Sequence, residues 1–248
     1  MAAVFVTTAT FQDEQQRAAN VAVLPVGSFE QHGPALPLVT DTLIACLIAR
    51  HIADAHALFL LPPLTISCSH EHAGFAGTVS ISARTLHATV EDIRESLRRS
   101  GISKLVLVNG HGGNYVLSNV TREANVEGSH VTLFPARDDW DAARREAGLT
   151  TTASEDMHAG ELETSLLLYA HPDVIREDHR PQDHLASTRT HLLLTGMRAY
   201  TDSGVIGRPS LATPEKGEAA LASLTASFAG HLRLLDRPQT GGHTPEQS

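Results

Sequence analysis

The stretch VAVLPVGSFEQHGPALPLVTD, residues 21–41, decides how the rest of the chain is interpreted. It opens with the apolar run Val21–Val26, which is typical of a buried strand. Glu30 and His32 follow two residues apart, so both side chains point the same way if the backbone stays extended there. Asp41 comes after a proline-rich turn, at the predicted start of a helix. This set suits two divalent ions that share one bridging carboxylate. A plainer alternative is a capped turn, with Asp41 as the helix cap and His32 as a loop donor.

Strand-like and helix-like segments alternate along the chain. This alternation predicts an α/β fold, a three-layer sandwich whose mostly parallel central sheet is flanked by helices. Ligands of such sheets bind beyond the carboxyl ends of the strands, where three motif-bearing loops are expected to meet. Ser82 is the expected N-cap of one helix and Gly101 its expected stop. Strands are predicted at 21–26, 104–108 and 131–134 with a short apolar run at 58–61, and helices at 41–57, 82–100, 160–170 and 214–235, with another after residue 114.

Length and composition limit the classes of function. The chain has 248 residues, which suits one domain at 1–237 followed by a polar tail at 238–248. The formal charge of −9 argues against nucleic acid as a partner, because phosphate binding needs basic patches. No apolar run approaches eighteen residues, and residues 1–10 lack a basic segment, so neither a membrane span nor a secretory signal is expected. With only Cys46 and Cys68 and no sign of pairing, the expected location is the cytoplasm.

A second motif, NGHGGN at residues 109–114, directly follows the predicted strand 104–108. It lacks the patterns of a phosphate-binding loop, and a histidine presented between glycines at a strand end suits a metal ligand better. Asn109 and Asn114 are expected to fix the turn or to bind substrate, and Gly112 is counted with them as a substrate contact.

A third motif, DMHAGELETS at residues 156–165, precedes an apolar helix. Here His158 is the candidate general acid or base, and Glu161 or Glu163 a candidate metal ligand. The alternative for both glutamates is simple stabilisation of a helix N-terminus by acidic side chains.

A fourth motif, SCSHEHAGFAGT at residues 67–78, carries polar groups beside glycines. The side chains of His70 and His72 share one face, a spacing that metal ligands can have. We favour a position for this segment in the pocket wall or behind the metal ligands, and predict that Glu71 and His72 contact substrate rather than metal.

Together these motifs resemble the creatininase family of metal-dependent amidohydrolases. The resemblance runs from Leu24 to about Gly217 and includes GVIGRP at residues 204–209 as a C-terminal signature. It implies a creatininase-like fold, a homo-oligomer, often a hexamer built from dimers, and two zinc, manganese or iron ions per chain. The implied ligands are Glu30, His32 and His111, with Asp41 as the bridge.

Two departures from the family pattern affect the predicted site. Gly113 stands where creatininase itself has a metal-binding glutamate, so another carboxylate must complete the second metal site, and Glu163 is favoured over Glu161. Ala35 stands where the family often has histidine, which speaks against creatinine as the substrate. In the predicted reaction, hydroxide shared by the metals attacks a carbonyl carbon, His158 protonates the departing nitrogen and Glu161 orients it.

Three functions compete on these residues. The leading one is hydrolysis of a non-peptide C–N bond in a small molecule, either a cyclic amide or a formamide. The second is a peptidase that trims a small peptide, as in mycofactocin maturation, which the GHGGN turn resembles. The third is a metal-stabilised binding protein without catalysis. The presence of His158 beside a full ligand set argues against it, because a purely structural metal site needs no adjacent acid. The segment 137–156, with Trp140, is a candidate lid, and residues 171–213 are expected to be mostly loop that borders the site or a neighbouring subunit.

Overall fold

The computed structural model describes residues 6–236, without the side chains of Glu177 and Asp178. Within this part, four parallel strands form one sheet in the order β2-β1-β3-β4. They are β1 (Val21–Val26), β2 (Phe59–Leu60), β3 (Lys104–Asn109) and β4 (Val131–Phe134). The predicted tail at 238–248 lies outside the described residues, and the single domain stays a prediction.

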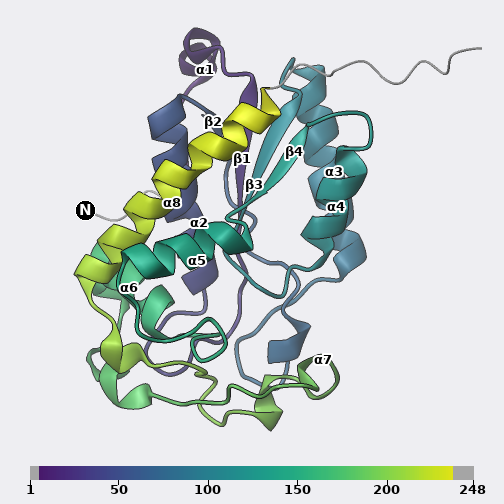
Figure 1. Ribbon diagram of the computed structural model, residues 1–248. Helices are drawn as coiled ribbons and strands as arrows, with labels where there is room; N and C mark the ends of the chain where they lie inside the picture. The colour runs from purple at the N-terminus through teal and green to yellow at the C-terminus, as the bar shows by residue number, and fades with distance from the viewer. Residues whose placement is uncertain (1–5, 237–248) are drawn as a thin grey trace, which may run out of the picture.

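Alternate residues of the central strands enter two separate cores, which makes the fold a three-layer α/β sandwich, as predicted. Val23 of β1 and Val106 of β3, which pair in register, face one core; Leu24 and Leu107, the next pair, face the other. Figure 1 shows one group of helices on each side of the sheet. The first core is closed by α2 (Thr40–His56), α5 (Arg137–Glu146), α6 (Glu161–Ala170) and α8 (Pro214–Leu235), and the second by α3 (Ala83–Arg99) and α4 (Val116–Ala124).

Local signals placed several helix ends correctly. The Ser82 hydroxyl accepts a hydrogen bond from the Thr85 amide at 3.2 Å, which confirms it as the N-cap of α3. Gly101 follows that helix with φ of +86°, a conformation that favours glycine. No helix of the described residues is long and apolar enough to cross a membrane.

Some helices lie outside the predicted set. The candidate lid contains a regular helix, α5, which buries Ala143 and Arg144 and packs against α8. The segment 171–213, expected to be mostly loop, also holds α7 (Leu192–Thr195) and short 3-10 helices. These are η2 (Pro172–Val174), η3 (Glu177–Gln182), η4 (Met197–Ala199) and η5 (Pro209–Leu211); η1 (His70–His72) lies earlier in the chain, and α1 (Phe11–Arg17) precedes β1.

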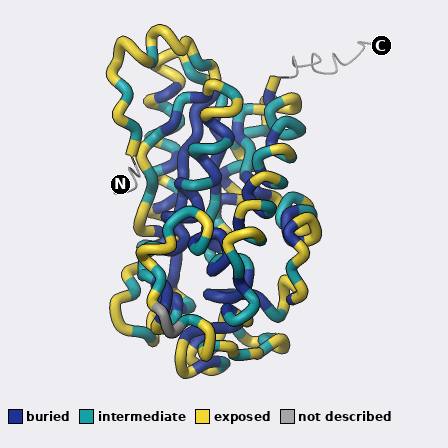
Figure 2. Tube along the Cα trace, turned by 90° about the vertical axis from the view of Figure 1, so that its left-hand side faces the viewer, coloured by how far each residue is buried: buried dark blue, intermediate teal, exposed yellow. Residues whose placement is uncertain are grey.

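The strand order places a crevice at the carboxyl ends of β1 and β3. The chain leaves β1 toward β2 on one side and later returns to add β3 on the other, and such a reversal opens a space above the neighbouring strands. Loops after both strands enter this space, and Figure 2 shows that buried residues continue from the sheet into this part of the molecule.

Close packing at this crevice depends on Gly110. A Cβ added there would lie 2.3 Å from the carbonyl oxygen of Asp41, well inside van der Waals contact. We expect Gly110→Ala to lower the free energy of unfolding by about 1–3 kcal/mol, because backbone must move to admit the methyl group. Gly112→Ala is the matched control, since a Cβ there meets nothing within 4 Å. Urea unfolding of both variants tests this expectation. Equal urea midpoints would show that the backbone at the start of α2 moves without a cost in stability.

Candidate metal centre

Asp41 lies at the centre of a buried group of histidines and carboxylates. Its two oxygens face different rings: Oδ1 is 3.0 Å from His32 Nε2, and Oδ2 is 3.0 Å from His111 Nδ1. The hydroxyl of Ser28 donates a 2.8 Å hydrogen bond to Oδ2 and helps to hold the carboxylate. A carboxylate placed between two imidazoles in this way has the arrangement that a bridging ligand needs.

Two possible ligand groups share Asp41. One is Glu30, Asp41 and His111, the other is His32, Asp41 and Glu163, and in each the ligand atoms lie within 4.8 Å of one another. A third possible group joins Glu30 and His32 to His158. All five predicted metal ligands therefore come together, as the sequence led us to expect, from the loop after β1, the start of α2, the loop after β3 and the first turn of α6.

Glu30 provides the test of whether metal ions fit here. Its side chain is completely buried, and neither carboxylate oxygen has a hydrogen-bond partner among the described residues. Two ring nitrogens lie close to this carboxylate, His111 Nε2 at 3.2 Å and His72 Nε2 at 3.3 Å. A buried carboxylate without hydrogen bonds is costly, whereas divalent cations supply the missing partner. The donor set therefore fits metal.

Backbone oxygens orient the metal-facing histidines. The Nδ1 of His32 lies 3.1 Å from the carbonyl of Glu30, and the Nε2 of His111 lies 2.9 Å from the carbonyl of Cys68. An N–H that donates to a carbonyl fixes the tautomer and leaves the opposite ring nitrogen available for metal. In His32 that nitrogen is Nε2 and in His111 it is Nδ1, and these are the atoms that face Asp41.

Without metal the site retains protons. Burial lowers the pKa of His32, but the charge and hydrogen bond of Asp41, together with the charges of Glu163 and Glu30, outweigh it and raise the pKa to about 9. Burial raises the pKa of Glu163 to about 8. Ligands must be deprotonated to bind metal, so metal uptake is coupled to proton release.

His158 and His72 lie beside the ligand groups rather than apart from them. Burial lowers the pKa of both rings, and that of His158 well below its usual range. The Nε2 of His158 is 2.6 Å from the carbonyl of Gln31, which leaves its Nδ1 facing Glu30 at 3.8 Å. The Gln31 side-chain amide is 2.9 Å from His72 Nδ1. Gln31 therefore holds both rings, and no sequence signal marked it as a site residue.

Glu161 does not join the possible ligand groups, and its orienting role in the reaction stays a prediction. Its carboxylate pairs with Lys216 Nζ at 2.5 Å and accepts the Thr151 hydroxyl at 2.6 Å. Glu163, two residues later on α6, accepts the Ala159 amide and lies with His32 and Asp41. Residues two apart on a helix point to nearly opposite sides, which is why only one of the two glutamates reaches the metal ligands.

The two asparagines fix the turn after β3, one of the two roles expected of them, and their contacts with substrate stay a prediction. Asn109 donates from Nδ2 to the carbonyl of His111 at 2.8 Å, and Asn114 accepts from the Cys68 amide at 3.1 Å. Asn114 also donates to the Asn109 side chain at 3.0 Å and is buried. Their side-chain bonds are largely used within the protein. Gly112 borders two cavities, and its predicted role as a substrate contact stays a prediction.

Gly113 explains where Glu71 lies. A Cβ at Gly113 would be 2.0 Å from Glu71 Oε1 and 2.3 Å from His111 Nε2, so the space beside the histidine is already filled by the Glu71 carboxylate. Glu71 Oε1 is 3.4 Å from His111 Nε2. Its side chain is only 18% exposed and borders the same cavity as His72, so the predicted substrate contacts of both residues remain open.

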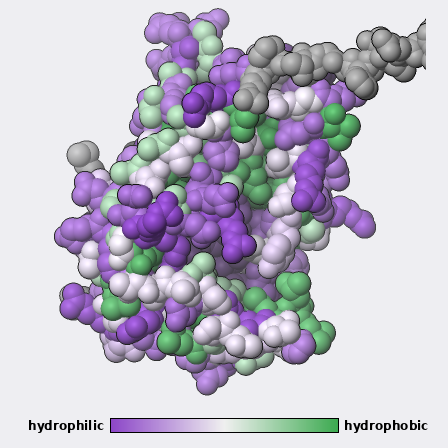
Figure 3. All heavy atoms as spheres, viewed as in Figure 1, coloured by the Kyte–Doolittle hydropathy of each residue, from purple (hydrophilic) through white to green (hydrophobic). Residues whose placement is uncertain are grey.

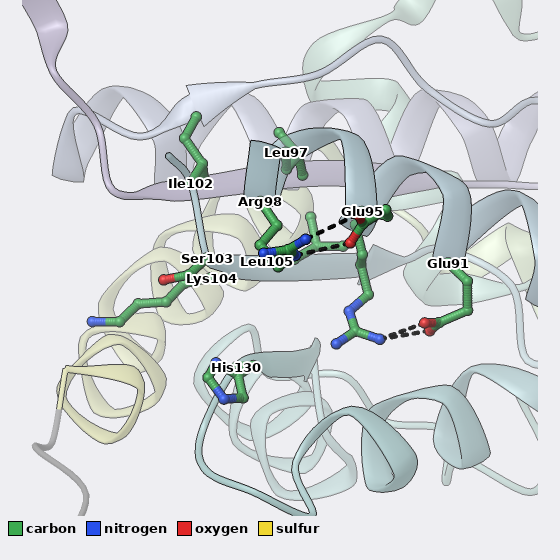
Figure 4. A pocket seen from close by; sticks show the side chains of 10 residues that line it. Glu91, Glu95, Leu97, Arg98, Ile102, Ser103, Lys104, Leu105 and His130 are labelled. Carbon is green, nitrogen blue, oxygen red and sulfur yellow. Dashed lines mark hydrogen bonds and ion pairs between the residues drawn. The ribbon is translucent and has the colours of Figure 1, made fainter. Parts of the chain in front are cut away.

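A hollow at the opposite, amino-terminal end of β3 is a weaker candidate for function (Figure 4). It has a volume of about 170 Å³. The charged side chains of α3 that line it pair with each other, Arg94 with Glu91 at 2.7 Å and Arg98 with Glu95 at 2.8 Å. The metal cluster is therefore the candidate functional site.

Comparison with known proteins agrees with this geometry. The profile of the creatininase family, described as creatinine amidohydrolase, matches residues 6–232. The chain belongs to the creatininase family. It is 35% identical over 217 residues to a mycofactocin precursor peptide peptidase of Mycobacterium ulcerans, covering 82% of this chain and 80% of the relative. It is 30% identical over 251 residues to creatinine amidohydrolase of Pseudomonas putida, covering 93% and 96%.

The creatininase fold is equally clear from solved structures. A crystal structure of creatininase superposes with a TM-score of 0.80 at 26% identity, covering 96% of this chain and 100% of that one. A manganese creatininase gives a TM-score of 0.79 at 26% identity, with 93% and 98% covered. With its buried histidines and carboxylates, the chain is a creatininase-family metal-dependent hydrolase.

Proposed function

We propose that this creatininase-family hydrolase binds two divalent metal ions and cleaves a C–N bond in a small peptide. The observation that carries the metal chemistry is the position of Asp41, shared by two ligand groups. The peptide is supported by relatives: mycofactocin precursor peptide peptidases of several mycobacteria are 33–35% identical to the chain, above the 30% of the creatinine amidohydrolase. This choice favours the second function considered from the sequence over hydrolysis of a non-peptide bond.

Bound at Glu30, His32, Asp41, His111 and Glu163, two divalent ions would supply an acidified water and polarise the scissile carbonyl. The remaining work falls to the chain. His158 is buried with its Nε2 committed to the Gln31 carbonyl, so proton transfer must occur at Nδ1. Burial keeps this ring neutral, and Nδ1 would first accept a proton and then deliver it to the departing nitrogen. This order uses His158 both as base and as acid, the two roles that the sequence left open for it.

Replacement of His158 by alanine should reduce turnover about 10²- to 10⁴-fold while both metals stay bound, because general acid–base groups contribute about that much. Metal content by mass spectrometry and peptide cleavage by chromatography measure the two effects. His87→Ala is the matched control, since that ring is exposed and pairs with Glu123 on the surface. Loss of one metal in His158→Ala would instead make His158 a ligand, as its grouping with Glu30 and His32 would allow.

A substrate panel decides between the peptide and a small amide. The metal-loaded protein should cleave blocked oligopeptides faster than creatinine or an N-formyl amine at equal concentration. Hydrolysis of creatinine with no cleavage of any peptide would overturn the proposal. That result would favour the small-molecule function, which the 30% identity to creatinine amidohydrolase supports.

A further inference from the structure

Two of the predicted metal ligands, His111 and Glu163, border the middle one of three adjoining cavities. A central cavity of about 220 Å³ contains His158 and the edge of the cluster. It shares His111, Gly112, Met157 and Glu163 with a cavity of about 340 Å³ that extends to α5. On its other side it shares Glu71, Gly113, Tyr115, Leu192 and Leu193 with a cavity of about 460 Å³ that extends to α7 and η1. Figure 1 shows α5 and α7 well apart.

The end of this groove at α5 is largely apolar with a polar rim. Trp140 forms its wall together with Leu162 and Leu166 of α6. Trp140 is partly buried and packs against the first core, so its ring has a fixed position. Arg137, which is exposed, and Asp141 lie at the rim.

The end at α7 presents hydrophobic side chains to solvent. Leu193 is 82% exposed, Leu194 is 84% exposed and Tyr115 is 63% exposed, which are high values for such side chains. Figure 3 shows hydrophobic atoms gathered in the region where Figure 1 places α7. Leu193 and Tyr115 also border the central cavity with the metal ligands His111 and Glu163, so this surface is continuous with the site.

Between the two ends, the lining of the groove includes a glycine without neighbours that would crowd a side chain. Gly112 borders both the α5 cavity and the central one, and a Cβ there would meet open space. A substrate can therefore approach the main chain of this turn without a side chain in the way. Small amides would fill only the central cavity, whereas an extended chain would also use the two flanking ones.

We infer that the groove binds an extended peptide across the metals, with residues on both sides of the scissile bond held in separate cavities. On one side an apolar side chain contacts Leu193, Leu194 and Tyr115, and on the other a side chain contacts Trp140. This inference rests on the proposed peptidase function and adds that recognition is two-sided and apolar. Burying a leucine side chain in such a cavity is expected to improve kcat/KM about tenfold or more.

The test uses the metal-loaded protein and a hexaglycine peptide, acetylated and amidated at its ends, with one glycine at a time replaced by leucine. Cleavage products identified by mass spectrometry place each leucine before or after the cut. We expect leucine to raise kcat/KM on both sides, Leu193→Asp to abolish the gain on one side only, and Trp140→Ala to abolish it on the other. Val126→Asp is the control, because Val126 is 81% exposed but borders none of the three cavities.

Several results would overturn the inference. One is a rise in kcat/KM for leucine on only one side of the cut. Another is an equal fall in kcat/KM for all peptides in both Leu193→Asp and Trp140→Ala. A third is dissociation of an oligomer by Leu193→Asp in light scattering, which would make the α7 leucines a subunit contact. If the wild-type protein cleaves no peptide, the proposed function has failed. Calorimetry with the same peptides then tests peptide binding in the groove separately. Binding that depends on leucine and is lost in Leu193→Asp supports the inferred groove, and absence of binding refutes it.

Discussion

Replacement of Asp41 by alanine should leave the protein with almost no bound metal and reduce hydrolysis by more than about a hundredfold. The carboxylate contributes one oxygen to each of the two ligand groups, so its loss removes a ligand from both ions at once. Even partners that only orient metal ligands cost about 10- to 100-fold in affinity or activity when they are changed, and a shared ligand should cost more.

Metal content per chain, measured after purification and again after incubation with zinc or manganese, tests this expectation. Glu161→Gln is the matched control, an acidic residue of α6 whose carboxylate faces Lys216 and Thr151. That variant should keep the wild-type metal content. Two ions retained by Asp41→Ala would mean that Asp41 does not bridge, and metal loss in Glu161→Gln would restore Glu161 to the site.

Replacement of Arg144 by methionine should lower the free energy of unfolding by about 3–5 kcal/mol, the cost of leaving a buried charge unpaired. Arg144 donates to Asp156 Oδ2 at 2.9 Å and to the Thr151 carbonyl at 2.7 Å. The Asp156 side chain is 1% exposed and also accepts the amides of Glu161 and Leu162, so it caps α6, the helix that presents Glu163.

Urea unfolding of Arg144→Met, Asp156→Asn and the double variant measures the coupling. We expect the double variant to be more stable than Arg144→Met, because asparagine keeps a polar cap without a buried charge. Burial raises the pKa of Asp156 despite Arg144. The penalty in Arg144→Met should therefore shrink as the pH falls, since protonation removes the unpaired charge. A penalty independent of pH, or full additivity of the two substitutions, would show that the ion pair is not its source.

Local patterns were enough to predict the main strands and most of the longer helices, and they placed the candidate ligands in loops beyond strand ends. Val21–Val26 is apolar at every position because both faces of a central parallel strand are covered, and its burial is complete. The carboxyl ends of parallel strands meet at one edge, which is why loops after β1 and β3 bring Glu30 and His111 within 3.2 Å although 81 residues separate them.

The remaining features depend on signals of another kind. Helix α5 falls in the segment that was a candidate lid, but Trp140, Ala143 and Ala147 recur at helical spacing and all pack against the first core. Glu163 was favoured over Glu161 as a metal ligand, and the contact that holds the Glu161 carboxylate away from the cluster comes from Lys216 of α8. The partners of Asn114 and Gln31 come from loops distant in sequence. Contacts of this kind follow from tertiary packing, which a single sequence does not encode locally.

The two unpartnered oxygens of Glu30 have a consequence for the lifetime of the protein. The metal-free fold buries this carboxylate without a hydrogen-bond partner among the described residues, while the unfolded chain exposes it to water. Ions that bind only the folded chain stabilise it by RT ln(1 + [L]/Kd), about 4 kcal/mol when free metal is a thousandfold above Kd. Proteases cleave chains that have opened. Bound metal lowers the fraction of opened chains, so the supply of metal should set the lifetime of the protein in the cell as well as its activity.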